Sequence, residues 1–121
     1  MSDSNLLSAR VEAEIIELAQ SLVRLKSLPG QEEAAIKFVA EKMKTLGYDE
    51  VTIDAMGNVV GRIGAGGKSI LLDAHVDTVA VNDAAEWEIP PFSGAVVNGR
   101  LHGRGSVDMK SAVAAAVYAG I

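Results

Sequence analysis

The chain has 121 residues, about one domain, and apolar residues make up 49% of it. Its formal net charge of -5 disfavours non-specific nucleic-acid binding, which needs clustered basic residues. Because cysteine is absent, disulfides, thiolate zinc sites and cysteine nucleophiles are excluded. No stretch approaches the ~20 apolar residues of a membrane span, and the polar start, residues 1–5, does not resemble a secretory signal. We therefore expect a soluble cytoplasmic protein.

Two amphipathic helices are predicted at the start of the chain. Apolar residues recur every three or four positions in residues 8–26 and again in 31–46, with charged residues between them. Gly47 follows the second pattern and is placed to cap that helix. The period then changes to two. Residues 51–53 and 59–63 predict two strands that form a β-hairpin.

The second half of the chain predicts a strand, a second hairpin and a helix. Residues 70–74 are apolar nearly throughout, which favours a strand buried on both faces. Residues 88–92 contain prolines and show no assignable period, whereas residues 96–101 carry the Asn-Gly turn typical of a small hairpin. From Asp108 onward an Ala-rich run predicts a helix, and the order of elements is that of an α/β fold. Since this run is still apolar at Ile121, we expect the chain to be cut from a longer one.

The first candidate site residues follow the predicted buried strand. His75 and Asp77 are two positions apart, so an extended backbone would point both side chains the same way. An imidazole that binds a metal through one nitrogen needs an acceptor for its other N–H, and Asp77 is placed to be that acceptor. The carboxyl ends of strands in open α/β sheets are also where sites form. The alternative is a surface histidine and aspartate in a loop that caps the strand.

Asp108 is the second candidate, because it follows the flexible run of residues 103–105 and precedes the predicted helix. Its two carboxylate oxygens could bind a metal, even bridge two ions, but the residue could equally be only the N-cap of the helix. His102 is interpreted as a structural histidine. Trp87 and Phe92 are interpreted as a small apolar cluster.

Taken together, these motifs resemble the M20 metallopeptidase family. That family includes acetylornithine deacetylase, succinyl-diaminopimelate desuccinylase, carboxypeptidases and aminoacylases. The resemblance covers nearly the whole chain and rests on order and spacing in four places: residues 54–59, residues 75–79, residues 87–94 and residues 103–110. Residues 56–59 and 117–120 look especially near the YgeY-type, selenium-metabolism-linked hydrolases.

The resemblance implies a fold and a set of roles. Residues 1–121 would be the N-terminal part of a zinc-exopeptidase-like α/β/α catalytic domain, without the rest of that domain and without the dimerisation domain. His75 would be a ligand of one zinc ion, and Asp77 the catalytic acid that orients it. Asp108 would bridge two zinc ions, and the peptide bond after it is often cis in relatives. Cobalt or manganese could take the place of zinc. Relatives usually carry Gly-Gly where this chain has Ser111 and Ala112.

The implied activity is zinc-dependent hydrolysis of amide bonds in N-acyl amino acids or short peptides. The Glu-Glu pair, the further acidic ligand and the late histidine of the family have no counterpart here. We therefore expect the chain alone to be inactive and to bind zinc weakly, and the full-length form to be a homodimer that binds neither nucleic acid nor membrane. Two alternatives remain. The chain could be a non-catalytic truncated fragment or interaction module that pairs with a full-length relative, or it could keep its fold without a metal.

Overall fold

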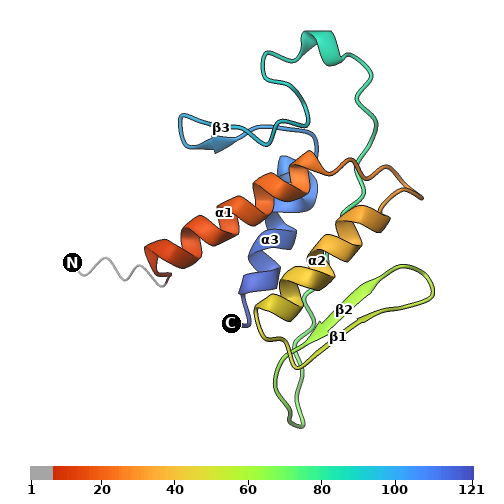
Figure 1. The fold of residues 1–121 in the computed structure, drawn as a ribbon, viewed down its shortest axis with the longest axis vertical. Helices are drawn as coiled ribbons and strands as arrows, with labels where there is room; N and C mark the ends of the chain where they lie inside the picture. Colours follow the sequence, from red (N-terminus) through yellow and green to blue (C-terminus); the bar gives the residue numbers. More distant parts are fainter. Residues whose placement is uncertain (1–6) are drawn as a thin grey trace.

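The computed structural model describes residues 7–121 and shows a helical layer flanked by two small hairpins (Figure 1). Residues 1–5, for which no secretory signal is predicted, lie outside the described residues. No helix within residues 7–121 is both long and apolar enough to cross a membrane. The elements in chain order are α1 (Ala9–Arg24), α2 (Glu33–Thr45), β1 (Glu50–Ile53), β2 (Val59–Arg62), a short turn η1 (Ala84–Glu86), β3 (Val96–Val97), β4 (Arg100–Leu101), a wide turn η2 (Ser106–Lys110) and α3 (Ser111–Tyr118).

The two predicted amphipathic helices are confirmed, each one or two residues shorter at its ends than the periodicity suggests. Ser8 caps α1, because its side chain accepts a hydrogen bond of 3.3 Å from the Val11 N–H. After α2, Gly47 has a φ of +84°, the left-handed conformation expected of a helix C-cap glycine. The buried faces of α1, α2 and α3 meet Val76 in one core: Leu18, Ala19, Leu22, Ala35, Val39, Val76, Val113, Ala114, Val117 and Tyr118.

The first hairpin is organised by the turn that joins its strands. β1 and β2 pair antiparallel, from Glu50 opposite Arg62 to Ile53 opposite Val59. In the turn, the Asp54 carboxylate accepts hydrogen bonds of 2.9 Å from the Asn58 side chain and from two backbone N–H groups. These bonds, that of the Asn58 side chain most of all, hold the pKa of Asp54 below its usual value. This local bonding explains why the hairpin could be predicted from the sequence.

The second hairpin is also present as predicted. β3 pairs antiparallel with β4, and Asn98 and Gly99 between them have φ values of 51° and 74°. A turn with positive φ at both central residues has the twist that a tight antiparallel hairpin needs. With three helices and two hairpins in residues 7–121, the chain has the α/β composition expected.

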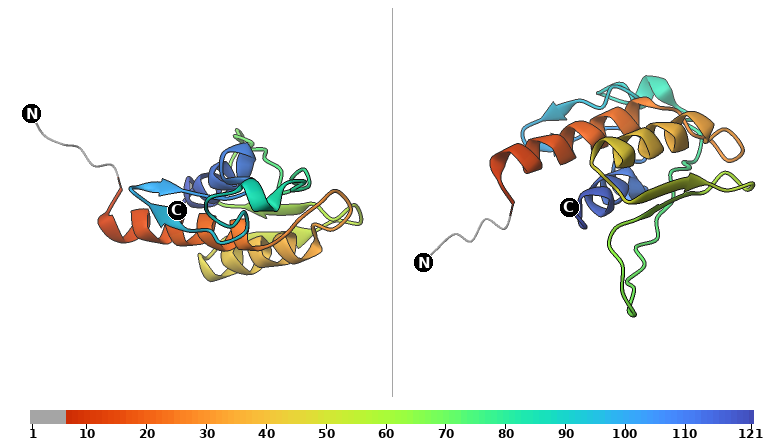
Figure 2. Two further views of the ribbon diagram at one scale, coloured as in Figure 1. Left: turned by 90° about the horizontal axis from the view of Figure 1, so that it is seen from above. Right: turned by 60° about the horizontal axis from the view of Figure 1, so that its bottom comes forward.

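The predicted buried strand at residues 70–74 is wrong. In the structure these residues form an irregular, extended stretch, and Ile70 and Leu71 are 91% and 84% exposed. Figure 2 shows the chain after β2 leaving the helices as a long loop before it returns to the core. A strand covered on both faces needs hydrogen-bonded neighbours, and within the described residues both sheets are separate two-stranded hairpins. Apolar composition therefore marks this stretch as suited to burial, but nothing among residues 7–121 covers it.

The last helix begins later than predicted. α3 starts at Ser111, whereas Asp108 (φ −121°, ψ 93°) and Met109 (φ −141°, ψ 35°) are not helical. The chain turns sharply at this point because the next residue, Lys110, is fully buried beneath α1. Asp108 is consequently not the N-cap of α3, and its carboxylate is free to face another segment.

Candidate functional site

The structure brings His75 and Asp108 together although 33 residues separate them in the chain. His75 Nε2 lies 3.1 Å from Asp108 Oδ1. His75 comes just after the exposed stretch at residues 70–74, and Asp108 lies in the turn before α3. Both side chains are open to solvent, 47% and 85% exposed, so their mutual attraction alone contributes little to stability.

Asp77 occupies the other side of the same imidazole. His75 Nδ1 lies 3.1 Å from the Asp77 carboxylate and also 3.1 Å from the Asp77 backbone carbonyl. Val76 and Thr78, on either side of Asp77, are buried, while His75 and Asp77 face outward, as the alternation of an extended backbone requires. The sequence-based expectation that the two side chains share a face is confirmed.

The histidine is therefore held between two acceptors, and this has a chemical consequence. A neutral imidazole has one N–H and one lone pair. If Nδ1 donates to Asp77, the Nε2 lone pair and the Asp108 carboxylate face each other across 3.1 Å. In this tautomer the two atoms face each other as two ligands of one metal ion would, whereas in the other tautomer Nε2–H donates to Asp108.

The spacing suits a metal as well as a proton. Zinc binds histidine nitrogen and carboxylate oxygen at about 2.0–2.2 Å, so two ligands of a tetrahedral ion lie about 3.4 Å apart. The observed 3.1 Å needs only a few tenths of an ångström of widening. However, no group of three or more potential metal-binding side chains occurs in the part of the chain that the structure describes. The residues present thus fit two positions of a metal site that needs three or four.

The peptide bond between Asp108 and Met109 is cis, as the resemblance implies for the residue at this position.

The carboxylates of Asp77 and Asp108 differ in how the chain holds them. Asp77 is anchored by buried neighbours, whereas Asp108 projects from a turn whose anchor is Lys110.

Lys110 and Ser27 are two supporting residues that the sequence reasoning missed. Both are fully buried. Lys110 Nζ donates hydrogen bonds to the backbone carbonyls of Leu22 and Leu25, and burial lowers its pKa to about 8. Ser27 contacts the segment that carries His75 and Asp77. For Lys110, the sequence signal was a lysine directly before an otherwise apolar helix.

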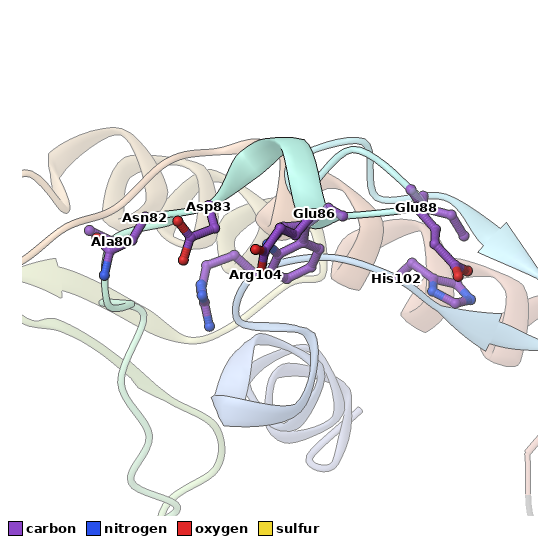
Figure 3. Close-up of a pocket in the computed structure, with 9 residues that line it drawn as sticks. Ala80, Asn82, Asp83, Glu86, Glu88, His102 and Arg104 are labelled. Carbon is purple, nitrogen blue, oxygen red and sulfur yellow. The ribbon is translucent and has the colours of Figure 1, made fainter.

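A separate pocket of about 490 Å³ contains the other residues considered from the sequence, Trp87 and His102. Figure 3 shows His102, Arg104 and three carboxylates, Asp83, Glu86 and Glu88, around it. The Arg104 guanidinium lies over the Trp87 ring, 5.3 Å from its centre, and Lys26 lies 4.8 Å from the centre of the Phe92 ring. Each aromatic ring therefore faces a cation of its own. None of His75, Asp77 and Asp108 lines this pocket.

Comparison with known proteins gives a consistent family. The model for peptidase family M20/M25/M40 matches residues 71–120, the region that contains His75, Asp77 and Asp108. The uncharacterized protein YgeY of Escherichia coli strain K12 is 34% identical over 109 residues, which is 90% of this chain and 27% of that protein.

Two other relatives are named succinyl-diaminopimelate desuccinylases. The protein of Xanthobacter autotrophicus is 39% identical over 110 residues, 86% of this chain and 29% of its own length. That of Methylocella silvestris is 37% identical over 108 residues, 83% of this chain and 28% of its own length. The chain thus spans between a quarter and a third of the length of these relatives. By its motifs, their geometry and these matches, it belongs to peptidase family M20.

Proposed function

We propose that this chain supplies His75 and Asp108 to the metal site of a zinc-dependent hydrolase that cleaves amide bonds of N-acyl amino acids or short peptides. The observation that carries the proposal is the approach of His75 Nε2 to Asp108 Oδ1, 3.1 Å apart, with Nδ1 of the same ring facing Asp77. Family membership and the desuccinylase names of two relatives support the reaction class.

Each residue has a separate task in this proposal. Asp77 accepts the Nδ1–H of His75, which fixes the tautomer and turns the Nε2 lone pair outward. Asp108 would supply carboxylate oxygens as further ligands of the ion. When bound, a zinc ion supplies Lewis-acid polarisation of the amide carbonyl. Cobalt or manganese, which bind the same donor atoms, are alternatives.

We propose further that the remaining metal ligands and the general base come from outside these 121 residues. Two donors meet here among the described residues, and the relatives are more than three times as long. We therefore propose that the chain alone is catalytically inactive. We also propose that the complete protein is a homodimer, as the family resemblance implies, and that it is cytoplasmic.

Calorimetric titration with zinc, cobalt and manganese tests the metal role. The wild-type chain should bind weakly, and both His75→Ala and Asp108→Ala should abolish the heat. His102→Ala, which removes the other histidine, should leave it unchanged. Equal heats in all four proteins would remove any metal role from His75 and Asp108. Zinc-dependent turnover of N-acetyl or N-succinyl amino acids by the chain alone would contradict the need for further ligands.

A second candidate function is supported by the exposed apolar stretch at residues 70–74. Ile70, Leu71 and Leu72 are 91%, 84% and 56% exposed, and their backbone has no strand partner within residues 7–121. Such a stretch can pair with another chain by strand addition. In this alternative the chain is a non-catalytic module that pairs with a full-length relative.

Mixing the chain with a purified full-length relative and measuring mass by light scattering separates the two functions. A complex of defined stoichiometry, lost on Leu71→Asp, favours the interaction module. A monomer with a broad unfolding transition and dye binding favours a fragment of the hydrolase.

A further inference from the structure

The strongest unassigned feature is the stretch at the end of α1, residues 22–27, which contacts both segments of the candidate site. We call it the α1 exit. In Figure 1 the turn before α3 lies behind the C-terminal end of α1. The contact is direct, because Lys110 in that turn donates hydrogen bonds to the Leu22 and Leu25 carbonyls.

The first contact fixes the segment of His75 and Asp77. The buried hydroxyl of Ser27 donates a hydrogen bond of 2.6 Å to the Val76 carbonyl. The Thr78 N–H in turn donates to the Ser27 carbonyl at 2.9 Å. Ser27 therefore bonds to the residues before and after Asp77, so that the direction in which His75 and Asp77 project is set from behind.

The second contact fixes the segment of Asp108. Lys110 is two residues further along, and its Nζ donates to the carbonyls of Leu22 and Leu25 at 2.9 and 2.6 Å. The Leu22 carbonyl also accepts a hydrogen bond of 3.2 Å from the N–H of Leu25, the C-cap residue of α1. Both carbonyls lie at the negative end of the helix dipole, so they stabilise an ammonium group. Because a buried ammonium without partners is costly, these bonds hold Lys110 at one place under α1.

The two segments that these contacts hold also pack against each other. Gly105 lies between them, and a Cβ on it would be 2.6 Å from Thr78 Cγ2 and 3.3 Å from Lys110 Cδ. Thr78 and Lys110 are both buried. The segment of His75 and the segment of Asp108 are therefore packed against each other over the α1 exit, without a spacer between them.

We infer that Ser27 and Lys110 are positioning residues, which set the separation of His75 Nε2 from Asp108 Oδ1 through the α1 exit. This inference rests on the proposed function for the purpose of the pair. The positioning itself needs no metal, since the 3.1 Å approach is a property of the chain. The side chains of Ser27 and Lys110 donate hydrogen bonds to backbone carbonyls and not to His75 or Asp108, so their effect on the pair is indirect.

Proton NMR of the imidazole rings tests this, because the chain has two histidines. His102→Gln assigns the two Hε1 signals. Asp108→Asn should shift the His75 signal in the wild-type background, and this shift measures the pairing. In Lys110→Met and Ser27→Ala backgrounds the same substitution should shift the signal by less than half as much. Lys110→Arg, which keeps a positively charged donor at this position, should restore most of the shift.

Lys42→Met is the matched control, since Lys42 packs over the Tyr118 ring away from the α1 exit. It should leave the coupling between Asp108 and His75 intact. If Asp108→Asn moves nothing in the wild type, the pairing and with it the proposed function are wrong. If the wild-type shift is present but survives in Lys110→Met and Ser27→Ala, the positioning inference alone is overturned. Ser27→Ala removes a single hydroxyl and provides the test where Lys110→Met does not fold.

Discussion

Gly105 offers the sharpest test of how the candidate site is assembled. Its φ is +82°, and an added Cβ would meet Thr78 Cγ2 at 2.6 Å and Lys110 Cδ at 3.3 Å. Both neighbours are buried and hydrogen-bonded, so neither can retreat without moving a segment of the site. Gly30 is a matched control, because it has the same φ of +82° and nothing within 4 Å of the position of its Cβ.

Both alanine substitutions place a side chain on a residue with positive φ, but only Gly105→Ala also creates a steric clash. An L-residue in the left-handed region costs about 1–2 kcal/mol, and we expect Gly30→Ala to lose about this much stability. Gly105→Ala adds the cost of forcing an extra carbon into a packed contact, about 1–3 kcal/mol. The total expected for Gly105→Ala is therefore about 2–5 kcal/mol.

Urea unfolding followed by circular dichroism measures both losses. We expect the free energy of unfolding to fall further for Gly105→Ala than for Gly30→Ala, and the NMR signal of His75 to move only in Gly105→Ala. Equal losses in the two variants would show that the contact among Gly105, Thr78 and Lys110 is loose. The account of how the two segments are held together would then be wrong.

Three other predictions concern the imidazole, the first hairpin and the exposed stretch. Asp77→Asn should weaken zinc binding about 10–100-fold in calorimetry, because it removes the carboxylate that orients the histidine, whereas Asp73→Asn on the same segment should not. The pKa of Asp54 is lowered in the folded state, so its contribution to stability is present above the usual aspartate pKa and is lost as the pH falls through the folded value. The difference in unfolding free energy between wild type and Asp54→Asn should accordingly shrink as the pH falls toward 3, and a constant difference would contradict it. Leu71→Asp should reduce dye binding and aggregation without lowering the unfolding free energy, since Leu71 is 84% exposed, and a loss of stability would mean that it packs against the core.

The parts of the fold that the sequence predicts correctly are those held by near neighbours. The period of apolar residues identifies α1 and α2, because one face of each helix must be buried whatever covers it. The turn around Asp54 and the Asn98–Gly99 turn are set by hydrogen bonds and backbone angles within five residues. Their hairpins therefore follow from local chemistry.

The structure of residues 70–74, in contrast, does not follow from local chemistry. Its composition is that of a buried strand, but burial is a property of what lies next to a segment, and within residues 7–121 no strand pairs with it. Likewise, the Ala-rich run predicts α3 but not its start, because the burial of Lys110 under α1 turns the chain at Asp108 and Met109.

The order of residues is enough to identify the groups that could bind a cation: an imidazole with a carboxylate two positions away, and a second carboxylate after a glycine-rich turn. That His75 and Asp108 meet could be learned only from the folded chain, because their approach depends on the contacts that Ser27 and Lys110 make at the end of α1. These contacts join residues between 49 and 88 positions apart, and no local pattern encodes a hydrogen bond over that separation.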